Sequence, residues 1–137
     1  MYFYPSAYTS GCNIQAHTFA VNFGKFVAAG ARIIGVSLDS IARLKAFSAN
    51  PDYCAGKIAV ASDPDGKIAR SYELTVKEVV PGTKDIRGDT IDHGFAERST
   101  FVVTPYGKIA AALSGFAPAV NVEKALEVVR QLAAKRQ

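Results

Sequence analysis

Cysteine and histidine are scarce in this chain of 137 residues, which contains two of each. Two cysteines cannot build a disulfide framework, and neither histidine lies at metal-ligand spacing from a cysteine. We therefore expect no metal site, and nothing in the sequence points to a cofactor. Long apolar runs are missing as well, because Gly, Lys or Pro interrupts each of them, and this argues against a membrane-spanning helix.

A concentrated basic patch is also missing, although the net charge is +4. Lysine and arginine are spread along the chain, and only Lys135 and Arg136 are adjacent. No basic run alternates with aromatic residues as in nucleic-acid-binding modules, so we expect neither a nucleic-acid nor a membrane partner. The N-terminal residues lack the features of a signal peptide, and we expect a cytoplasmic protein. Because the chain starts inside an expected core strand, the loss of an upstream segment, even a targeting one, stays open.

The length and the apolar content of 49% suit one domain, residues 1–137, with a buried core. Hydrophobic patterns predict elements in the order β-α-β-α-β-α-β-β-α. The predicted strands are residues 1–5, 31–37, 58–62, 99–104 and 107–113. The predicted helices are residues 12–29, one ending at Asn50, one around Ile68 and one from Asn121. The continuous apolar run 31–37 suits a strand buried on both faces, so we expect a mostly parallel sheet with a closing hairpin.

Local signals set the ends of some elements. Asp39 and Ser40 are predicted to cap the second helix, and Asn121 is predicted to cap the last one. Residues 75–97 contain Pro81, three glycines and several charges. We expect this segment, here called the excursion, to be exposed and to consist of loops with a small hairpin.

The most informative stretch joins the first strand to the first helix and ends at Cys12. Pro5 cannot donate a ladder hydrogen bond and should end the strand, while Ser10 and Gly11 are turn residues. Apolar residues from Phe19 onward recur at helical spacing, which places Cys12 in the first helical turn. Unpaired N–H groups and the helix dipole at that end stabilise a thiolate over a thiol, which makes a cysteine reactive.

The spacing Pro5-x-x-x-Thr9-x-x-Cys12 resembles the active-site loop of peroxiredoxins of the AhpC/TSA type. YFYPSAYTSGCNIQAHTF is most similar to their bacterioferritin-comigratory, or Q-type, branch, and ARIIGVSLDS, SDPDGKIARSYEL and ERSTFVVTPYGKI resemble later blocks in the family's order. The resemblance implies a thioredoxin-like α/β fold, a five-stranded mixed sheet with helices on both faces, with the N-terminal peroxiredoxin extension missing. Two positions differ: His17 stands where many relatives carry a second cysteine, and Ser10 stands where proline is usual.

The resemblance implies a thiol-dependent peroxidase that reduces hydrogen peroxide and alkyl hydroperoxides through a sulfenic acid on Cys12. Lowering a thiol pKa from about 8.5 by about two units speeds its reaction only about threefold near neutral pH, because nucleophilicity falls with the pKa. Most of the rate must therefore come from groups that stabilise charge on the departing peroxide oxygen. Thr9 can present its hydroxyl to the sulfur and the peroxide. By resemblance, Arg98 pairs with both, and Pro5 keeps water off the sulfur.

A second thiol has to return the sulfenic acid to the thiol state. Cys54 is the only internal candidate for a resolving cysteine, but its role as a small buried apolar residue is an equal alternative. If Cys54 does not resolve Cys12, an outside thiol such as thioredoxin, glutaredoxin or a low-molecular-weight thiol does so. We expect the protein to be a monomer or a weak dimer.

Two other functions stay open from the sequence. A thioredoxin-like thiol–disulfide oxidoreductase would share the fold, but such enzymes use Cys-x-x-Cys, and the first place here is Thr9. A redox-sensing binding protein would oxidise at Cys12 and signal through the excursion. We interpret His17 as a packed or exposed side chain rather than a base, leave His93 unassigned, and note that Gln15 matches a polar position of the family's helix.

Overall fold

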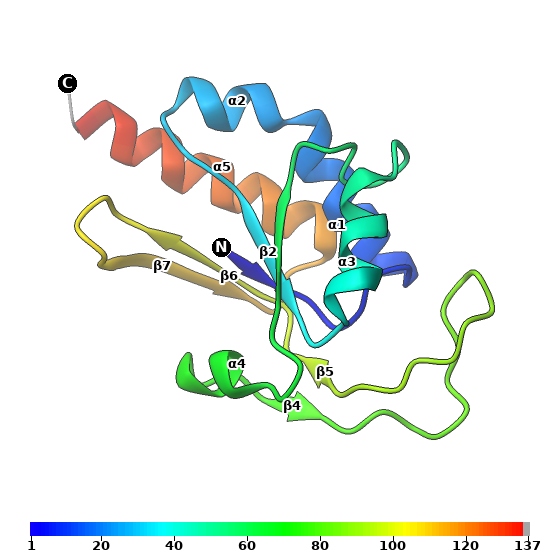
Figure 1. Cartoon of the computed structure of the whole chain (residues 1–137). Helices are drawn as coiled ribbons and strands as arrows, with labels where there is room; N and C mark the ends of the chain where they lie inside the picture. The colour runs from blue at the N-terminus through cyan, green and yellow to red at the C-terminus, as the bar shows by residue number, and fades with distance from the viewer. Residues whose placement is uncertain (136–137) are drawn as a thin grey trace.

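A five-stranded mixed sheet runs through the centre of the protein, in the spatial order β3-β2-β1-β6-β7 (Figure 1). The structure, a computed structural model, describes residues 1–135, so Arg136 of the basic pair lies outside it. The sheet consists of β1 (Tyr2–Phe3), β2 (Ile34–Ser37), β3 (Ala59–Ser62), β6 (Ser99–Val103) and β7 (Ile109–Ser114). β1, β2 and β3 are parallel, whereas β6 is antiparallel to both β1 and β7. The predicted mixed sheet with a closing hairpin is confirmed.

Strand β1 lies in the middle of the sheet and leads directly into the loop that precedes the helix that carries Cys12. Tyr2 pairs with Gly35 of β2 on one side and with Thr100 of β6 on the other. A Cβ atom at position 35 would lie 2.9 Å from the Tyr2 ring, so the glycine makes room for that ring. β1 ends at Phe3, earlier than predicted and ahead of the proline that cannot donate to the ladder.

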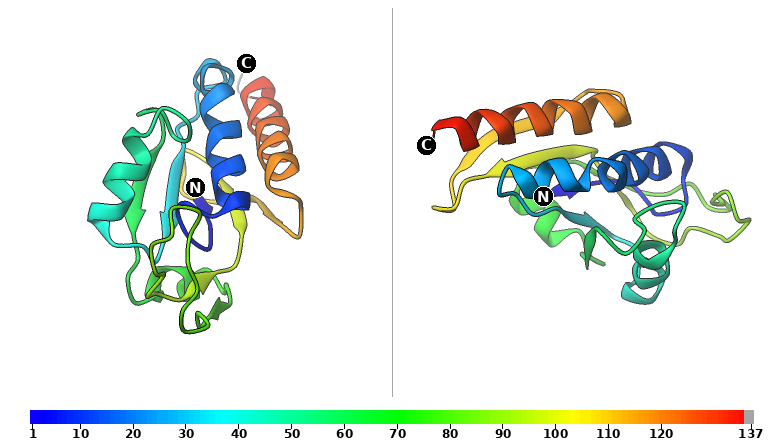
Figure 2. Two further views of the ribbon diagram at one scale, coloured as in Figure 1. Left: turned by 90° about the vertical axis from the view of Figure 1, so that its right-hand side faces the viewer. Right: turned by 90° about the horizontal axis from the view of Figure 1, so that it is seen from above.

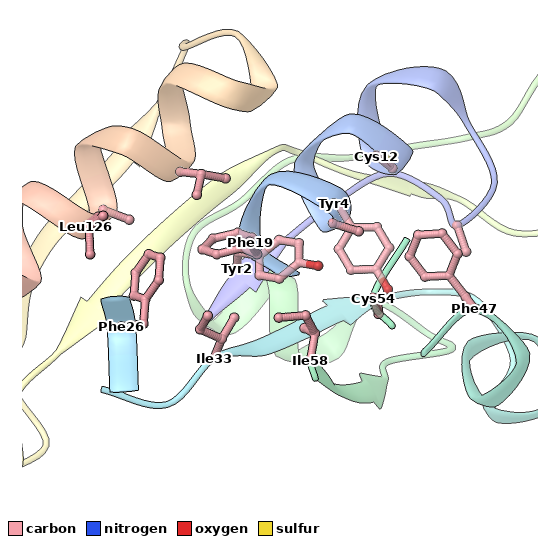
Figure 3. Close-up of a cluster of buried hydrophobic side chains, with 14 of the residues drawn as sticks. Tyr2, Tyr4, Cys12, Phe19, Phe26, Ile33, Phe47, Cys54, Ile58 and Leu126 are labelled. Carbon is pink, nitrogen blue, oxygen red and sulfur yellow. The ribbon is translucent and has the colours of Figure 1, made fainter. Parts of the chain in front are cut away.

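Within residues 1–135, four helices cover one face of the sheet (Figures 1 and 2): α1 (Ser10–Val21), α2 (Phe23–Ala28), α3 (Ile41–Ala49) and α5 (Pro118–Lys135). α1 and α5 lie side by side in these views. The helices form the larger core together with Tyr2 of β1 and Tyr4, which follows this strand (Figure 3), and its members include Tyr2, Tyr4, Phe19, Phe26, Phe47 and Leu126. Each large apolar side chain that is fully buried contributes about 1.5–3 kcal/mol, so this face supplies much of the stability.

The opposite face of the sheet carries α4 (Lys67–Ser71) and a two-stranded sheet of β4 (Val76–Lys77) and β5 (Phe95–Ala96). Phe3 points to this side, where its ring packs against those of Tyr72 and Phe101. Helices therefore lie on both faces, as predicted. β4 and β5 are the small hairpin expected in the excursion, whose remaining loops extend away from the sheet (Figure 1).

The first predicted helix, residues 12–29, is wrong in two respects. It begins at Ser10, and it is interrupted at Asn22, where α1 gives way to α2. The Thr18 carbonyl accepts two donors, the Asn22 side chain at 2.8 Å and the Asn22 backbone N–H at 3.2 Å, so the side chain competes with the helical hydrogen bond without replacing it. The chain can therefore change direction before α2 (Figure 1).

Two of the three predicted helix caps are also wrong. Ser40 does cap α3, because its Oγ accepts the N–H of Arg43 at 3.2 Å. Asp39 does not cap this helix, because its carboxylate is buried and binds other groups. α5 begins at Pro118, since proline suits the first turn of a helix, and Asn121 lies inside the helix with its side chain buried.

Candidate active site

Cys12 lies in the first turn of α1 and is only 1% exposed. Thr9 occupies the N-cap position with an extended backbone, and its carbonyl accepts the Asn13 N–H at 2.8 Å. No described side chain caps this end of α1. The first N–H groups of the helix therefore remain available to an anion, and the positive end of the helix lies at the sulfur.

The Arg98 side chain reaches Cys12 from the turn between β5 and β6. Its Nη2 donates to Cys12 Sγ at 3.4 Å, and its Nη1 donates to Gln15 Oε1 at 2.7 Å. A Cβ atom on Gly11 would lie 2.9 Å from the same Nη2, so the glycine allows the guanidinium to come this close. The fold thus brings together a thiol and a cation that are 86 residues apart in the sequence.

A buried chain of amide hydrogen bonds holds Gln15 in place. Gln15 Nε2 donates to Asn121 Oδ1 at 3.3 Å, and Asn121 Nδ2 donates to the Leu113 carbonyl at 3.0 Å. Thr100 Oγ1 donates to the same Asn121 oxygen. Because the Leu113 carbonyl can only accept, it fixes the orientation of the Asn121 amide, and this amide directs Gln15 Oε1 towards Arg98.

Thr9 and Pro5 lie on the loop before Cys12. The Thr9 hydroxyl donates to the carbonyl of Ser6 at 2.8 Å, and no hydrogen bond joins it to the sulfur within the described chain. The lone pairs of this hydroxyl can still accept a hydrogen bond from a bound molecule. Pro5 is half-buried immediately before Ser6.

The start of this loop is fastened by the buried carboxylate of Asp39, which follows β2. Its Oδ2 accepts the Ala7 N–H at 2.8 Å and the Ser37 hydroxyl at 2.6 Å. Its Oδ1 accepts the Ser6 hydroxyl at 3.2 Å. One carboxylate therefore joins the end of β2 to the backbone that leads to the reactive turn.

Two basic side chains meet the same carboxylate. Arg43 Nε donates to Asp39 Oδ1 at 2.7 Å, and His93 Nε2 lies 2.8 Å from that oxygen. Arg43 also donates from Nη2 to the Ala7 carbonyl at 2.7 Å and pairs through Nη1 with Asp85 Oδ2 at 2.7 Å. Burial acts to raise the pKa of Asp39, but the hydrogen bonds that it accepts from His93 and other donors outweigh burial and lower the pKa. The carboxylate is therefore held in its charged form.

The excursion lies against the loop at Tyr8. The Ile86 N–H donates to the Tyr8 carbonyl at 3.0 Å, and the Arg87 guanidinium lies 3.4 Å from the centre of the Tyr8 ring. Tyr8 has a left-handed backbone, with φ of 61°, a conformation that costs a bulky residue about 1–2 kcal/mol. The contacts from the excursion help to hold this unfavourable turn, from which the chain enters α1.

Cys54 lies in the turn that follows α3 and is fully buried. Burial raises the pKa of its thiol to about 12. Both cysteines are free, and Figure 3 shows the Tyr4 ring between them. Both thiols lie close enough to Tyr4 to add to the effect of burial, which raises the pKa of its phenol. In this conformation a ring therefore separates the two sulfur atoms.

Sequence reasoning missed Asp39, Arg43 and His93 as parts of the site. One signal was present for Asp39, because a carboxylate directly after a buried parallel strand lies at the sheet edge where sites form. Arg43 stands four positions later, at a spacing that places the two side chains together on entry to a helix. No local pattern marks His93, which reaches the carboxylate from the excursion, 54 residues away.

An apolar cleft of about 680 Å³, lined by Tyr2, Phe26 and Phe101 among others, does not include Cys12 or Arg98. No helix within residues 1–135 is both long and apolar enough to cross a membrane. In the same part of the chain, no group of three or more His, Cys, Asp or Glu side chains is arranged to hold a metal ion. The reactive turn is therefore the part of the described chain with the clearest chemistry.

A free cysteine at the start of a helix, in contact with an arginine on a thioredoxin-like sheet, defines a thiol-based redox protein. The AhpC/TSA family model matches residues 1–112, and the chain belongs to this family. A Mycobacterium tuberculosis relative with a peroxiredoxin name is 36% identical over 112 residues, which cover 82% of this chain and 64% of that protein.

Two further comparisons concern Xanthomonas campestris. Its Peroxiredoxin Bcp is 32% identical over 112 residues, which cover 82% of this chain and 63% of that protein. A solved structure of its bacterioferritin comigratory protein, from work on alkyl peroxide reduction activity, has a TM-score of 0.76 at 28% identity and covers 96% of this chain and 77% of that one. The predicted bacterioferritin-comigratory branch and thioredoxin-like fold are confirmed. The chain spans less than two thirds of the length of the two curated relatives.

Proposed function

We propose that the protein is a thiol-dependent peroxidase that reduces hydrogen peroxide and alkyl hydroperoxides at Cys12. The thiolate attacks one peroxide oxygen, so that a sulfur–oxygen bond forms while the oxygen–oxygen bond breaks. The departing oxygen takes up a proton and leaves as water or an alcohol, and Cys12 becomes a sulfenic acid. The observation that carries this proposal is the contact of Arg98 Nη2 with Cys12 Sγ at 3.4 Å.

Arg98 would stabilise the transition state of this reaction. Negative charge grows on the departing oxygen, and a guanidinium provides a permanent cation with several donors in a fixed plane. Gln15 holds one side of that plane through Nη1, which leaves Nη2 directed at the sulfur. A lysine could not make both contacts with the same geometry, because its ammonium is a compact charge on a flexible stem.

Thr9 and Pro5 would orient and shield the peroxide. The Thr9 hydroxyl gives its proton to the Ser6 carbonyl, so its lone pairs would accept the hydrogen of a peroxide O–H group. Pro5 would form a wall of the site and limit the access of water to the sulfur. The low exposure of Cys12, 1%, fits a site for small oxidants.

An outside thiol is the reductant that this conformation favours. The Cys54 thiol has a pKa raised by burial to about 12, so almost none of it is the thiolate needed to attack a sulfenic acid. A thiolate of thioredoxin, glutaredoxin or a low-molecular-weight thiol would form a disulfide with Cys12 and release water, and a second thiol would then release the Cys12 thiolate. Cys54 would take part only after its turn opens. A monomer or weak dimer and a cytoplasmic location stay predictions.

Stopped-flow oxidation of the purified protein tests the proposed function. Wild-type protein should consume hydrogen peroxide on the order of 10³-fold faster than free cysteine, the range in which positioned donors act, and Cys12→Ser should abolish this reaction. Arg98→Ala should slow the peroxide reaction by about 10²-fold while slowing alkylation of Cys12 by iodoacetamide much less, because only the peroxide reaction builds charge on oxygen. Arg130→Ala, on the exposed side of α5, is the control. A wild-type rate no greater than that of free cysteine would rule the proposal out.

A further inference from the structure

Both ring nitrogens of His93 face hydrogen-bond acceptors. Nδ1 lies 2.8 Å from the Gly94 carbonyl oxygen, and Nε2 lies 2.8 Å from Asp39 Oδ1. A carbonyl and an ionised carboxylate carry no proton to give, so each nitrogen has to donate to its nearest partner. The Ser6 hydroxyl also lies 3.3 Å from Nε2, but it is farther away than Asp39 Oδ1 and donates to that same oxygen at 3.2 Å. Only the doubly protonated imidazolium can donate from both nitrogens at once.

The surrounding charges also favour the imidazolium. Asp39 and Asp85 are buried carboxylates, and Arg43 pairs with both of them at 2.7 Å. Arg87 is a weaker partner of Asp85, because it is 43% exposed and lies 3.9 Å away. With a neutral His93, two buried carboxylates would share one close cation, whereas the imidazolium supplies a second cation.

The remaining influences on His93 have opposite signs. Burial acts to lower the pKa of His93, and the nearby Arg43 adds a smaller effect in that direction. Hydrogen bonding to Asp39 and to the Gly94 carbonyl outweighs both effects, so the pKa is raised.

This histidine is joined to the reactive turn by an unbroken path. The carboxylate that accepts from His93 also accepts from the Ser6 hydroxyl and, through its other oxygen, from the Ala7 N–H at 2.8 Å. The Ser6 carbonyl in turn accepts the Thr9 hydroxyl at 2.8 Å. Thr9 occupies the N-cap position of the helix that carries the reactive thiol.

We propose that His93 is a positioning residue for the peroxidase reaction: as an imidazolium it ties the excursion to Asp39, and so fixes the loop that presents Thr9 and Cys12. When His93 loses a proton as the pH rises, one of its ring nitrogens presents a lone pair to its acceptor, either the Gly94 carbonyl or the Asp39 carboxylate. That contact is then lost, and the loop becomes less firmly held. This inference rests on the proposed function for its effect on rate, but the tie itself can be tested without peroxide.

Imidazole NMR of the ¹⁵N-labelled protein tests the protonation state directly, because the chain has only two histidines. Both His93 nitrogens should show the protonated signature near neutral pH, and their titration midpoint should lie above the value of about 6.5 of a free imidazole. A neutral His93 at neutral pH, or a His93 midpoint no higher than that of a free imidazole, would overturn the proposal.

Hydrogen exchange of the Ala7 amide tests the link to the loop. The protection factor of this amide should fall by about tenfold or more as His93 loses its proton, because the acceptor of its hydrogen bond is then less firmly held. The Thr104 amide, which donates to the Lys108 carbonyl at 2.7 Å in the β6–β7 turn, is the control and should keep its protection. Unchanged protection of Ala7 through the His93 midpoint would overturn the proposal even if the imidazolium is present.

The effect on chemistry is measured as the rate with peroxide divided by the rate of alkylation by iodoacetamide. Both reactions use the same thiolate, so the ratio removes the ionisation of Cys12. The ratio should fall about tenfold between about pH 6 and about pH 9, with the His93 midpoint, as expected when a reacting group loses its fixed position. His93→Gln should give a low ratio that does not change with pH, and His17→Gln should behave like wild type.

These outcomes separate the two proposals. A flat ratio in a wild-type protein that reacts rapidly with peroxide would overturn the role of His93 and leave the peroxidase intact. No peroxide reaction at any pH would remove the proposed function, while NMR and hydrogen exchange would still decide whether His93 fixes the loop. If His93→Gln does not fold, the three wild-type measurements still decide the matter.

Discussion

Gly11 controls how closely Arg98 can approach the thiol. A Cβ atom at this position would lie 2.9 Å from Arg98 Nη2 and 3.4 Å from Pro118 Cγ. The proline ring is part of α5 and cannot retreat easily, so an added methyl group would push the guanidinium away from the sulfur. The effect on chemistry should therefore be separable from any effect on folding.

Gly11→Ala should slow the peroxide reaction of Cys12 by about 10–100-fold, because a displacement of the order of an ångström has effects of this size. The free energy of unfolding should stay the same or rise, since alanine favours a helix over glycine by about 1 kcal/mol. Stopped-flow oxidation and urea unfolding measure the two quantities. Gly24→Ala in α2, where a Cβ meets nothing within 4 Å, is the matched control. Wild-type peroxide kinetics in Gly11→Ala would contradict the role given to this glycine.

Asn121 acts on the same guanidinium from a greater distance. Asn121→Leu would leave Gln15 Nε2, the Thr100 hydroxyl and the Leu113 carbonyl without their partner. We expect a loss of about 1–3 kcal/mol of stability for unpaired buried groups. We also expect the peroxide rate to fall by about tenfold, because Gln15 is then free to turn. Gln131→Leu, on the exposed side of α5, should change neither urea unfolding nor the rate; a stable Asn121→Leu protein with full activity would show that Gln15 needs no support.

At the scale of elements, the tie between the excursion and β2 makes stability depend on pH. The pKa of His93 is raised, so its contribution is fully present below its unfolded pKa of about 6.5 and is lost as the pH rises through the folded value. The pKa of Asp39 is lowered, so its contribution is present above about 3.9 and is lost as the pH falls. Both contributions are fully present between about pH 3.9 and about pH 6.5, so the free energy of unfolding should be greatest in this range.

Urea-unfolding midpoints measured between about pH 6 and about pH 8, in wild-type protein and in the two histidine variants, test this expectation. Wild-type protein should lose stability as the pH rises, because the unfolded state does not hold the proton that His93 holds when folded. His93→Gln should remove this slope, and His17→Gln should retain it. A slope that is equal in all three proteins would mean that other groups cause it.

The order of the elements could be predicted from the sequence, but their ends often could not. The apolar run 31–37 and the turn before β7 carry strong local signals, and both strands were found. The break at Asn22 was missed because a single polar side chain that competes for the Thr18 carbonyl leaves the apolar spacing unchanged. Asn121 was mistaken for a cap because a buried amide network has no pattern in a linear sequence.

The same limit applies to the site. Cys12 could be selected from its place at a helix start, whereas Arg98 was selected only by family resemblance. Gln15, which supports Arg98, lies 83 residues from it in the sequence. Asp39 and His93 are in contact although 54 residues separate them. Contacts over such separations depend on the assembled sheet, and local propensity carries no information about them.

At the scale of the whole molecule, both thiols lie in the larger core on one face of the sheet, with the Tyr4 ring between them (Figure 3). After one equivalent of peroxide, mass spectrometry should find sulfenic acid on Cys12 rather than a Cys12–Cys54 disulfide. Labelling of Cys54 by iodoacetamide should be slow in water and should accelerate in urea as its turn opens, since burial raises its pKa to about 12. Cys54→Ala should keep the wild-type rate of sulfenic acid formation. A disulfide that forms as fast as the peroxide is consumed would instead identify Cys54 as the resolving thiol.

The central place of β1 also has a consequence for biosynthesis. This strand precedes both of its neighbours in the chain, and Tyr2 pairs with residues 35 and 100. During translation, its second edge stays uncovered until β6 has left the ribosome, and pairing over such long separations is slow. Arg98 immediately precedes β6 and therefore arrives at the same late moment. A nascent chain thus holds its thiol without the guanidinium until Arg98 and β6 have been made.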